Sequence, residues 1–472
     1  MEVHHTFCHS KDEGASDFSP RCYPESPLDW LCVQLEELKA TVTLPDSDWL
    51  LIEKYLLMPL FDVNSIHDLD ISAADKNRLY FLMSQKSQPI AELLTQVGYE
   101  LFFTEVDAFG SASACDRSRY RPHLIADDNK VAKADSSCME YLTELFCPVE
   151  GVKLPAYNLV VLVATFGETD WEIPIAIRLW LPKTHPDYQS KPRLLKAMID
   201  DICAEAEKRG LSLFGVQFSC DAAYQRSHAL MGAVNLAGLR LVTKVSSNMT
   251  FWVGGQRKKA ATIRDEVTLA QMKQSGRLGC YYRYRRLVAQ HPQIGPVILI
   301  VSSLYDEKHD KYRRIVLMSN DLQIQAPAAI LMYKRRWRIE VWFKSAKQEL
   351  CLGRFQFRKL GSIISHFQLR GIAYLVVNVV RRCGFVHRSQ WTFLESRSVG
   401  KRCADRQAMA GNRINTTFST SLTLLSPSHA FAGLLFQASV LNFSTYYLAP
   451  EQSFSVLAIP LKDRKGNVLG VL

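Results

Sequence analysis

One basic stretch is most informative about the fold: Tyr333-Lys334-Arg335-Arg336-Trp337-Arg338-Ile339-Glu340, which continues to Lys347. On a helix with about 100° per residue, four polar side chains share a stripe about 60° wide, namely Tyr333, Arg336, Glu340 and Lys347. A single carboxylate among cations suits a site that binds a divalent metal and a phosphodiester. The carboxylate holds the metal, and the cations hold the phosphate oxygens.

This spacing, Tyr-x2-Arg-x3-Glu-x6-Lys, resembles the signature of the insertion sequence family 4 transposases. Those enzymes are DDE transposases with a ribonuclease-H-like core. Trp337 and Ile339 are similar to the family's usual Arg-Trp-Arg-Ile-Glu run. Trp337 lies outside the stripe, so it is expected to pack in the core, with a contact to DNA as the second interpretation. An ordinary basic amphipathic helix on the surface is the alternative interpretation. The resemblance implies two further carboxylates upstream, each at the end of a strand.

Two short apolar runs upstream stop at acidic residues. Residues 123–126 lead into Asp127-Asp128-Asn129, and residues 213–220 lead into Asp221-Ala222-Ala223-Tyr224. A buried strand that delivers a polar side chain at its carboxyl end has this pattern, whereas an acid that caps a turn is the alternative. The order and spacing of the two acids relative to Glu340 favour the strand interpretation.

The family resemblance implies a role for each polar residue. Residues 127–129 resemble its aspartate-aspartate-threonine turn with Asn129 in place of threonine, which makes Asp128 the first metal ligand and Asp127 the alternative. The implied catalytic residues and metal ligands are Asp128, Asp221 and Glu340. The implied DNA-binding residues are Tyr333, Arg336 and Lys347. The implied cofactor is a pair of Mg²⁺ (or Mn²⁺) ions, with Asp128 bridging them.

The remaining pattern predicts an α/β fold. Strands are expected at residues 157–166 and 171–181, and a helix at 191–209, before the strand that leads to Asp221. This order suits a ribonuclease-H-like mixed sheet flanked by helices. A β-rich insertion at about 239–325 is expected before the glutamate-bearing helix, with strands at 239–245, 281–288, 296–302 and 314–318.

The ends of the chain differ from this core in composition. Residues 1–110 contain 7 Lys and Arg against 19 Asp and Glu, whereas residues 111–472 contain 50 against 28. The acidic part is expected to be helical, with amphipathic stretches at 28–38, 49–60 and 91–103. The basic part is expected to attract a polyanion. Residues 454–472 resemble a strand–turn–strand of a GAF sensory domain.

Three regions follow: an acidic helical N-terminal region (1–110), a catalytic core with its insertion (111–385), and an irregular tail ending in the GAF-like fragment (386–472). No apolar run is long enough for a membrane span, so no membrane partner is expected. The 12 cysteines include no C-x2-C pair and are expected to be free thiols in a reducing bacterial cytoplasm, with the protein associated with the nucleoid.

The predicted function is that of a DNA transposase. It would act as a homodimer on the terminal inverted repeats of its element and on target DNA, through metal-dependent cleavage and strand transfer. Two alternatives stay open: a hydrolytic nuclease on the same core, and a decayed or captured transposase that only binds DNA.

Overall fold

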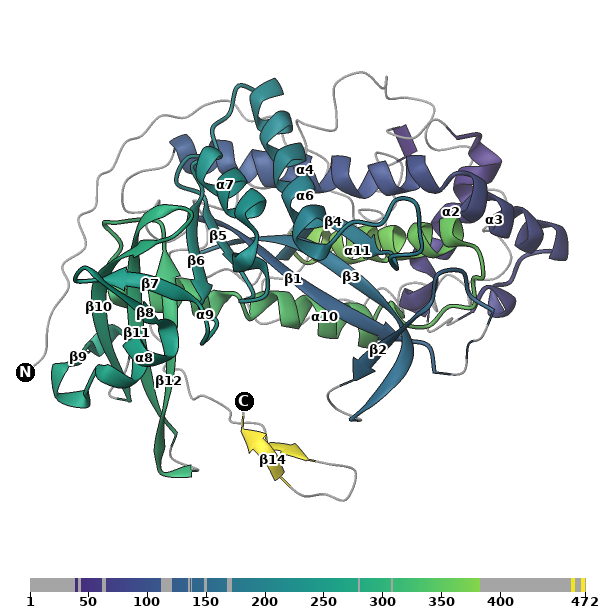
Figure 1. Cartoon of the computed structure of the whole chain (residues 1–472). Helices are drawn as coiled ribbons and strands as arrows, with labels where there is room; N and C mark the ends of the chain where they lie inside the picture. Colours follow the sequence, from purple (N-terminus) through teal and green to yellow (C-terminus); the bar gives the residue numbers. More distant parts are fainter. Residues whose placement is uncertain are drawn as a thin grey trace, which may run out of the picture.

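The computed structural model describes residues 39–382, with gaps at 41–43, 62–64, 112–120, 135, 137, 148–150, 168–171, 279–280 and 307–308, and also residues 460–462 and 468–471. Its centre is a mixed sheet covered by helices on both faces (Figure 1). Among these residues, no helix combines the length and the apolar character that crossing a bilayer requires.

The central strand β1 (Pro122–Ala132) pairs antiparallel with β3 (Val152–Phe166) and parallel with β5 (Gln217–Cys220). On the far edge of β3 lie β4 (Glu172–Trp180) and β2 (Thr143–Cys147), both antiparallel to it. Strand β6 (Arg240–Lys244) runs parallel to β5. The order β4-β3-β1-β5-β6, with β3 reversed, confirms the expected ribonuclease-H-like mixed sheet.

The β-rich insertion extends this sheet. Its strand β12 pairs antiparallel with β6, so residues 240–244 belong at once to the parallel core and to the edge on which the insertion is built. The insertion strands follow in the order β12-β11-β10-β7-β8, with β9 beside β10. Their bounds are β7 (Thr250–Val253), β8 (Gln256–Lys259), β9 (Lys273–Gln274), β10 (Tyr282–His291), β11 (Gly295–Asp306) and β12 (Lys311–Ser319). A short helix, α8 (Ala260–Glu266), packs against β8 and β12.

Helices α6 (Lys191–Lys208) and α7 (His228–Leu236) cover one face of the central strands, and α9 (Ala326–Arg335) and α10 (Arg338–Gln348) cover the other (Figure 1). The apolar stripe expected on α6 is buried: Leu194, Leu195, Met198, Ile199, Ile202 and Ala206. This burial holds the N-terminus of α6, and with it Lys191, against the sheet.

The N-terminal helices pack with a helix from the other end of the described core. Helix α4 (Ser87–Ser111) contacts β4 and α11 (Leu360–Arg382), and α11 also contacts α2 (Asp46–Leu57) and α3 (Ala73–Gln85). The helices expected at 49–60 and 91–103 are thereby confirmed, and α3 is additional. The helix expected at 28–38 and most of the tail lie outside the described residues. Within the tail, β13 (Pro460–Lys462) pairs antiparallel with β14 (Val468–Val471), as the strand–turn–strand pattern predicts.

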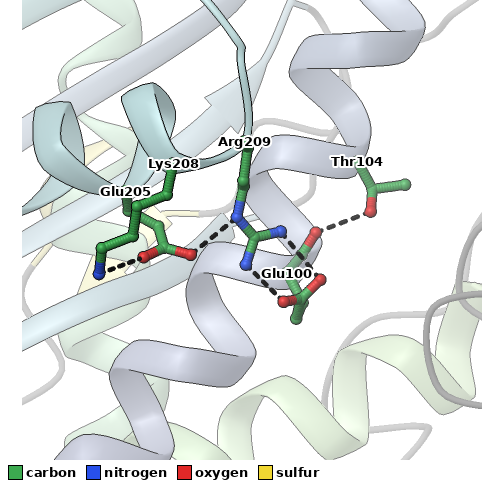
Figure 2. A network of polar contacts seen from close by, with 5 residues as sticks. All are labelled: Glu100, Thr104, Glu205, Lys208 and Arg209. Atoms are coloured by element: carbon green, nitrogen blue, oxygen red, sulfur yellow. Dashed lines mark hydrogen bonds and ion pairs between the residues drawn. The ribbon is translucent and has the colours of Figure 1, made fainter.

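A polar network ties α6 to α4 (Figure 2). Arg209 donates from Nη1 to Glu100 Oε2 over 3.0 Å and from Nε to Glu205 Oε1 over 2.9 Å. The hydrogen bond to Glu100 holds the pKa of Arg209 above its usual value, although partial burial opposes this. Lys208 donates to Glu205, and Thr104 donates to the Glu100 carbonyl oxygen. The acidic N-terminal region therefore contributes directly to the core packing.

We expect Gly98→Ala in α4 to lower the free energy of unfolding by about 1–3 kcal/mol, the usual cost of overpacking. A Cβ at Gly98 would lie 2.9 Å from Ile175 Cα and 3.0 Å from the Pro174 carbonyl oxygen, and backbone atoms cannot move aside cheaply. The matched control is Gly232→Ala in α7, where a Cβ meets nothing within 4 Å. Urea unfolding should show the control to be unchanged or more stable, because alanine favours helix. Equal stability of the two variants would contradict this packing.

Candidate active site

The stripe of Tyr333, Arg336, Glu340 and Lys347 does not lie on one continuous helix, as the sequence suggested. Helix α9 (Ala326–Arg335) ends just before Arg336, and α10 (Arg338–Gln348) carries the glutamate. Hydrogen bonds between residues three apart join the two helices, such as Trp337 N to the Lys334 carbonyl and Glu340 N to the Trp337 carbonyl. These bonds tighten the chain locally as in a 3₁₀ turn, which changes the direction of each side chain around the joint.

Asp127 is the carboxylate that Arg336 reaches. It is buried within β1, and its Oδ2 forms an ion pair with Arg336 Nη1. Burial raises the pKa of Asp127 to about 6, against the opposing effects of Arg336 and the Asp128 N–H, and the nearby charges of Glu340 and Asp221 raise it further. Asp127, Asp221 and Glu340 thus share one electrostatic environment.

Asp128 lies on the other face of β1, because successive side chains of a strand alternate. Its Oδ2 accepts a 2.6 Å hydrogen bond from Lys191 Nζ at the start of α6, and its Oδ1 accepts one of 3.2 Å from the Tyr224 hydroxyl. Tyr224 is fully buried in the 3₁₀ turn η3 (Tyr224–Arg226), and its pKa is raised by burial and by the two aspartates. Sequence reasoning missed Lys191 and Tyr224 as partners of Asp128.

Strand β1 also continues past the acidic pair to Ala132, so these residues do not end a strand as expected. What ends there is the parallel pairing with β5, whose last partners are Ala126 and Cys220. Asp221 follows Cys220 directly, and its Oδ2 accepts a 3.3 Å hydrogen bond from Ala223 N. The end of the shared pairing explains why Asp127 and Asp221 come close.

Of the two stripe residues at the ends, Lys347 contacts β1 and Tyr333 lies beside Arg336. Lys347 Nζ donates to Asn129 Oδ1 over 2.5 Å and to the Lys130 carbonyl over 2.9 Å. Burial lowers the pKa of Lys347, and the negative charge of Glu340 opposes this. Tyr333 is half-buried beside Arg336, whose guanidinium carbon lies 5.7 Å from its ring centre.

Trp337 differs from its expected role in the core. Its side chain is 59% exposed, because the joint between α9 and α10 turns it away from the sheet. Trp342, one turn further along α10, is the tryptophan that packs in the core, and it contacts Phe343 and Tyr374.

Residues 155–376 match the family model described as "Transposase DDE domain". Residues 155–376 are therefore similar to transposase DDE domains. The matched residues include Asp221, Glu340 and the rest of the stripe, and they begin downstream of Asp127 and Asp128. A transposase DDE domain implies a DNA-processing enzyme with transposase activity, DNA binding and use of a divalent metal.

The NurA nuclease from Sulfolobus solfataricus is similar over 73% of this chain and 99% of the nuclease, at 8% sequence identity and a TM-score of 0.23. No curated protein sequence matches the chain.

The three carboxylates around Arg336 suit a hard divalent cation. Asp127, Asp221 and Glu340 carry carboxylate oxygens, the ligands that Mg²⁺ and Mn²⁺ prefer. Burial is the main cause of the raised pKa of Asp127, and the charges of Glu340 and Asp221 add to it, a repulsion that a bound cation would relieve. Across the part of the chain that the structure describes, no three His, Cys, Asp or Glu side chains already converge on one point as metal ligands. The Arg336 guanidinium instead takes one oxygen of Asp127.

Proposed function

We propose that this protein is a transposase of the insertion sequence family 4 type, which cleaves DNA at the ends of its element and joins them to target DNA. The observation that carries this proposal is the packing of the Arg336–Glu340–Lys347 stripe on β1, around the buried carboxylate of Asp127. An ordinary surface helix would turn such a stripe towards solvent. The similarity of residues 155–376 to transposase DDE domains supports the same function.

We assign the metal-binding acids as Asp127, Asp221 and Glu340, with Asp127 in place of the Asp128 that the motif comparison preferred. Asp128 is already engaged by Lys191 and Tyr224 on the opposite face of β1, away from Arg336. A divalent cation bound by the three acids would stabilise negative charge on the phosphodiester.

The protein's own cations complete the site. Arg336 keeps guanidinium N–H groups beyond the one that pairs with Asp127, and these are suited to a non-bridging phosphate oxygen. Lys347 is held by Asn129 and by a backbone carbonyl, so its charge stays near Glu340. Tyr333 would donate its hydroxyl to a flanking phosphate. These groups orient the phosphodiester at the edge of the sheet.

The DNA partners are the terminal inverted repeats of the element and the target, bound by a homodimer associated with the bacterial nucleoid. Residues 1–110, 111–385 and 386–472 would form the helical region, the catalytic core with its insertion, and the tail with its GAF-like fragment. Exposed Trp337, beside the site, is available for contact with DNA bases.

A strand-transfer assay tests the proposed function. The DNA substrate carries the sequences that flank the gene, and a labelled plasmid serves as target. A transposase yields nicks at the element ends and then covalent joints with the plasmid. Cleavage without joints would favour the hydrolytic nuclease. DNA binding without cleavage would favour a decayed or captured transposase.

We expect the shortened protein of residues 1–385 to keep metal-dependent cleavage within about threefold of the full chain. All the proposed site residues precede residue 385, and α11, which packs against α3 and α4, ends at Arg382. A cooperative thermal melt shows whether the shortened protein folds, and the cleavage assay measures its activity. An insoluble or inactive product, beside an active full chain, would place the tail within the fold.

A further inference from the structure

A cavity of about 290 Å³ lies at the amino ends of the parallel strands, at the opposite end from the proposed catalytic acids. Arg121 directly precedes β1, Gln217 begins β5 and Arg240 begins β6. The other wall of the cavity comes from Asp321, Gln325 and Ala328, around the start of α9. The proposed reaction uses none of these side chains.

The charges around this cavity are unbalanced. Arg240 pairs with Asp321, at 3.6 Å between Nη1 and Oδ2. Arg121 is half-buried, and burial together with the charges of Arg240 and Arg335 lowers its pKa, with Asp321 opposing. Among the described residues, the Arg121 guanidinium has no hydrogen-bond or ion-pair partner. Within the cavity one carboxylate therefore faces two guanidinium groups, and an anion would relieve the repulsion between these two groups.

The uncharged groups of the cavity also favour an anion. Helix α9 begins here at Ala326, and its N-cap residue Gln325 makes no capping hydrogen bond with its side chain. Pro327 in the first turn has no N–H, so the remaining first-turn N–H groups of α9 and the helix dipole are what attract negative charge here. The amide oxygen of Gln217 is buried without a donor, and exchanging the two ends of that amide would present an NH₂ group to an anion instead.

We propose that this cavity is a phosphate-binding site, with Arg121 and Arg240 as the main ligands. Helix α9 leads from the cavity to Arg336, and its ten residues span about 15 Å. Phosphates along a DNA strand are about 3.4 Å apart in rise, so the two sites are separated by roughly four to five steps. If the proposed DNA function holds, the phosphate belongs to the DNA strand held at the catalytic site. A free phosphate compound is the other source of the same chemistry.

The test measures DNA binding by fluorescence anisotropy in EDTA, so that cleavage does not enter. Arg121→Gln and Arg240→Gln should each weaken binding about three- to tenfold and lower the slope of log Kd against log salt by about 1. Ala328→Glu, which puts a carboxylate on an exposed first-turn position of α9 that favours acids, should weaken binding similarly. Its matched control, Ala328→Gln, keeps the size without the charge and should bind like the wild type.

A second control removes one charge elsewhere. Lys208→Gln, whose side chain is 73% exposed at the end of α6, should leave the salt slope unchanged. A thermal melt of each variant confirms folding, and the Ala328 pair keeps the test valid if an arginine variant does not fold.

A parallel arm titrates inorganic phosphate and pyrophosphate and follows the melting temperature. If these stabilise the wild type but not Arg121→Gln, while DNA binding is equal in both, the site takes a small phosphate compound and the DNA assignment is wrong. If neither DNA nor phosphate distinguishes the variants, the phosphate site itself is refuted. If the variants bind DNA more weakly but the wild-type protein never cleaves DNA, the phosphate site stands and the proposed function is refuted. If the wild type cleaves DNA and the variants bind both DNA and phosphate normally, the proposed function stands and the phosphate site is refuted.

Discussion

Asp127→Asn should abolish strand cleavage, with a loss of at least about 10³-fold, while Asp128→Asn should keep most of the activity. Asp127 faces Arg336, Asp221 and Glu340, and an amide there cannot contribute the negative charge that holds a cation. Asparagine at position 128 can still accept from Lys191 through its amide oxygen, and its NH₂ group can donate to the Tyr224 hydroxyl oxygen, so the main loss is a partly exposed ion pair. That loss should cost about 1 kcal/mol of stability or less.

The measurement is single-turnover cleavage of a labelled DNA end, with anisotropy to show that each variant binds DNA. The two substitutions are matched, because they are adjacent and remove the same charge. Full activity of Asp127→Asn with an inactive Asp128→Asn would restore the motif-based choice of ligand. Full activity of both would show that β1 carries no catalytic acid. Glu340→Gln and Asp221→Asn should resemble Asp127→Asn.

Removal of divalent metal should stop cleavage completely while DNA binding persists. Mg²⁺ or Mn²⁺ should restore cleavage, whereas Ca²⁺ should not, because its longer bonds and looser coordination misplace the reacting groups. DNA binding should persist because the basic part of the chain, with 50 Lys and Arg against 28 Asp and Glu over residues 111–472, is expected to supply the binding energy.

The pH dependence of the metal requirement gives a finer measurement. The raised pKa of Asp127, about 6, means that protons compete with metal for this carboxylate below that pH. The Mg²⁺ concentration for half-maximal cleavage should therefore rise as the pH falls below about 6. Robust cleavage in EDTA, or with Zn²⁺ alone, would contradict a site built from hard carboxylate ligands.

Much of the fold was predictable because it depends on local patterns. The apolar run at 157–166 became the carboxyl-terminal part of β3, and the helical spacing at 191–209 became α6. The stripe of Arg336, Glu340 and Lys347 was also predictable, because the spacing of these residues lies within one or two helical elements. A helix as polar as α3, by contrast, has a weak apolar pattern and was not predicted.

By itself, then, the sequence determined the α/β core, the β-rich insertion and the charged stripe that implies chemistry on DNA. Only the tertiary structure decided which neighbouring aspartate faces that stripe, since adjacent residues of a strand point to opposite faces and the motif comparison is ambiguous by one position. It also decided that Lys191 and Tyr224 hold Asp128, that Trp337 is exposed, and that Arg121 and Arg240 meet at one cavity. Those contacts join residues far apart in the chain, and strand pairing, not local spacing, brings them together.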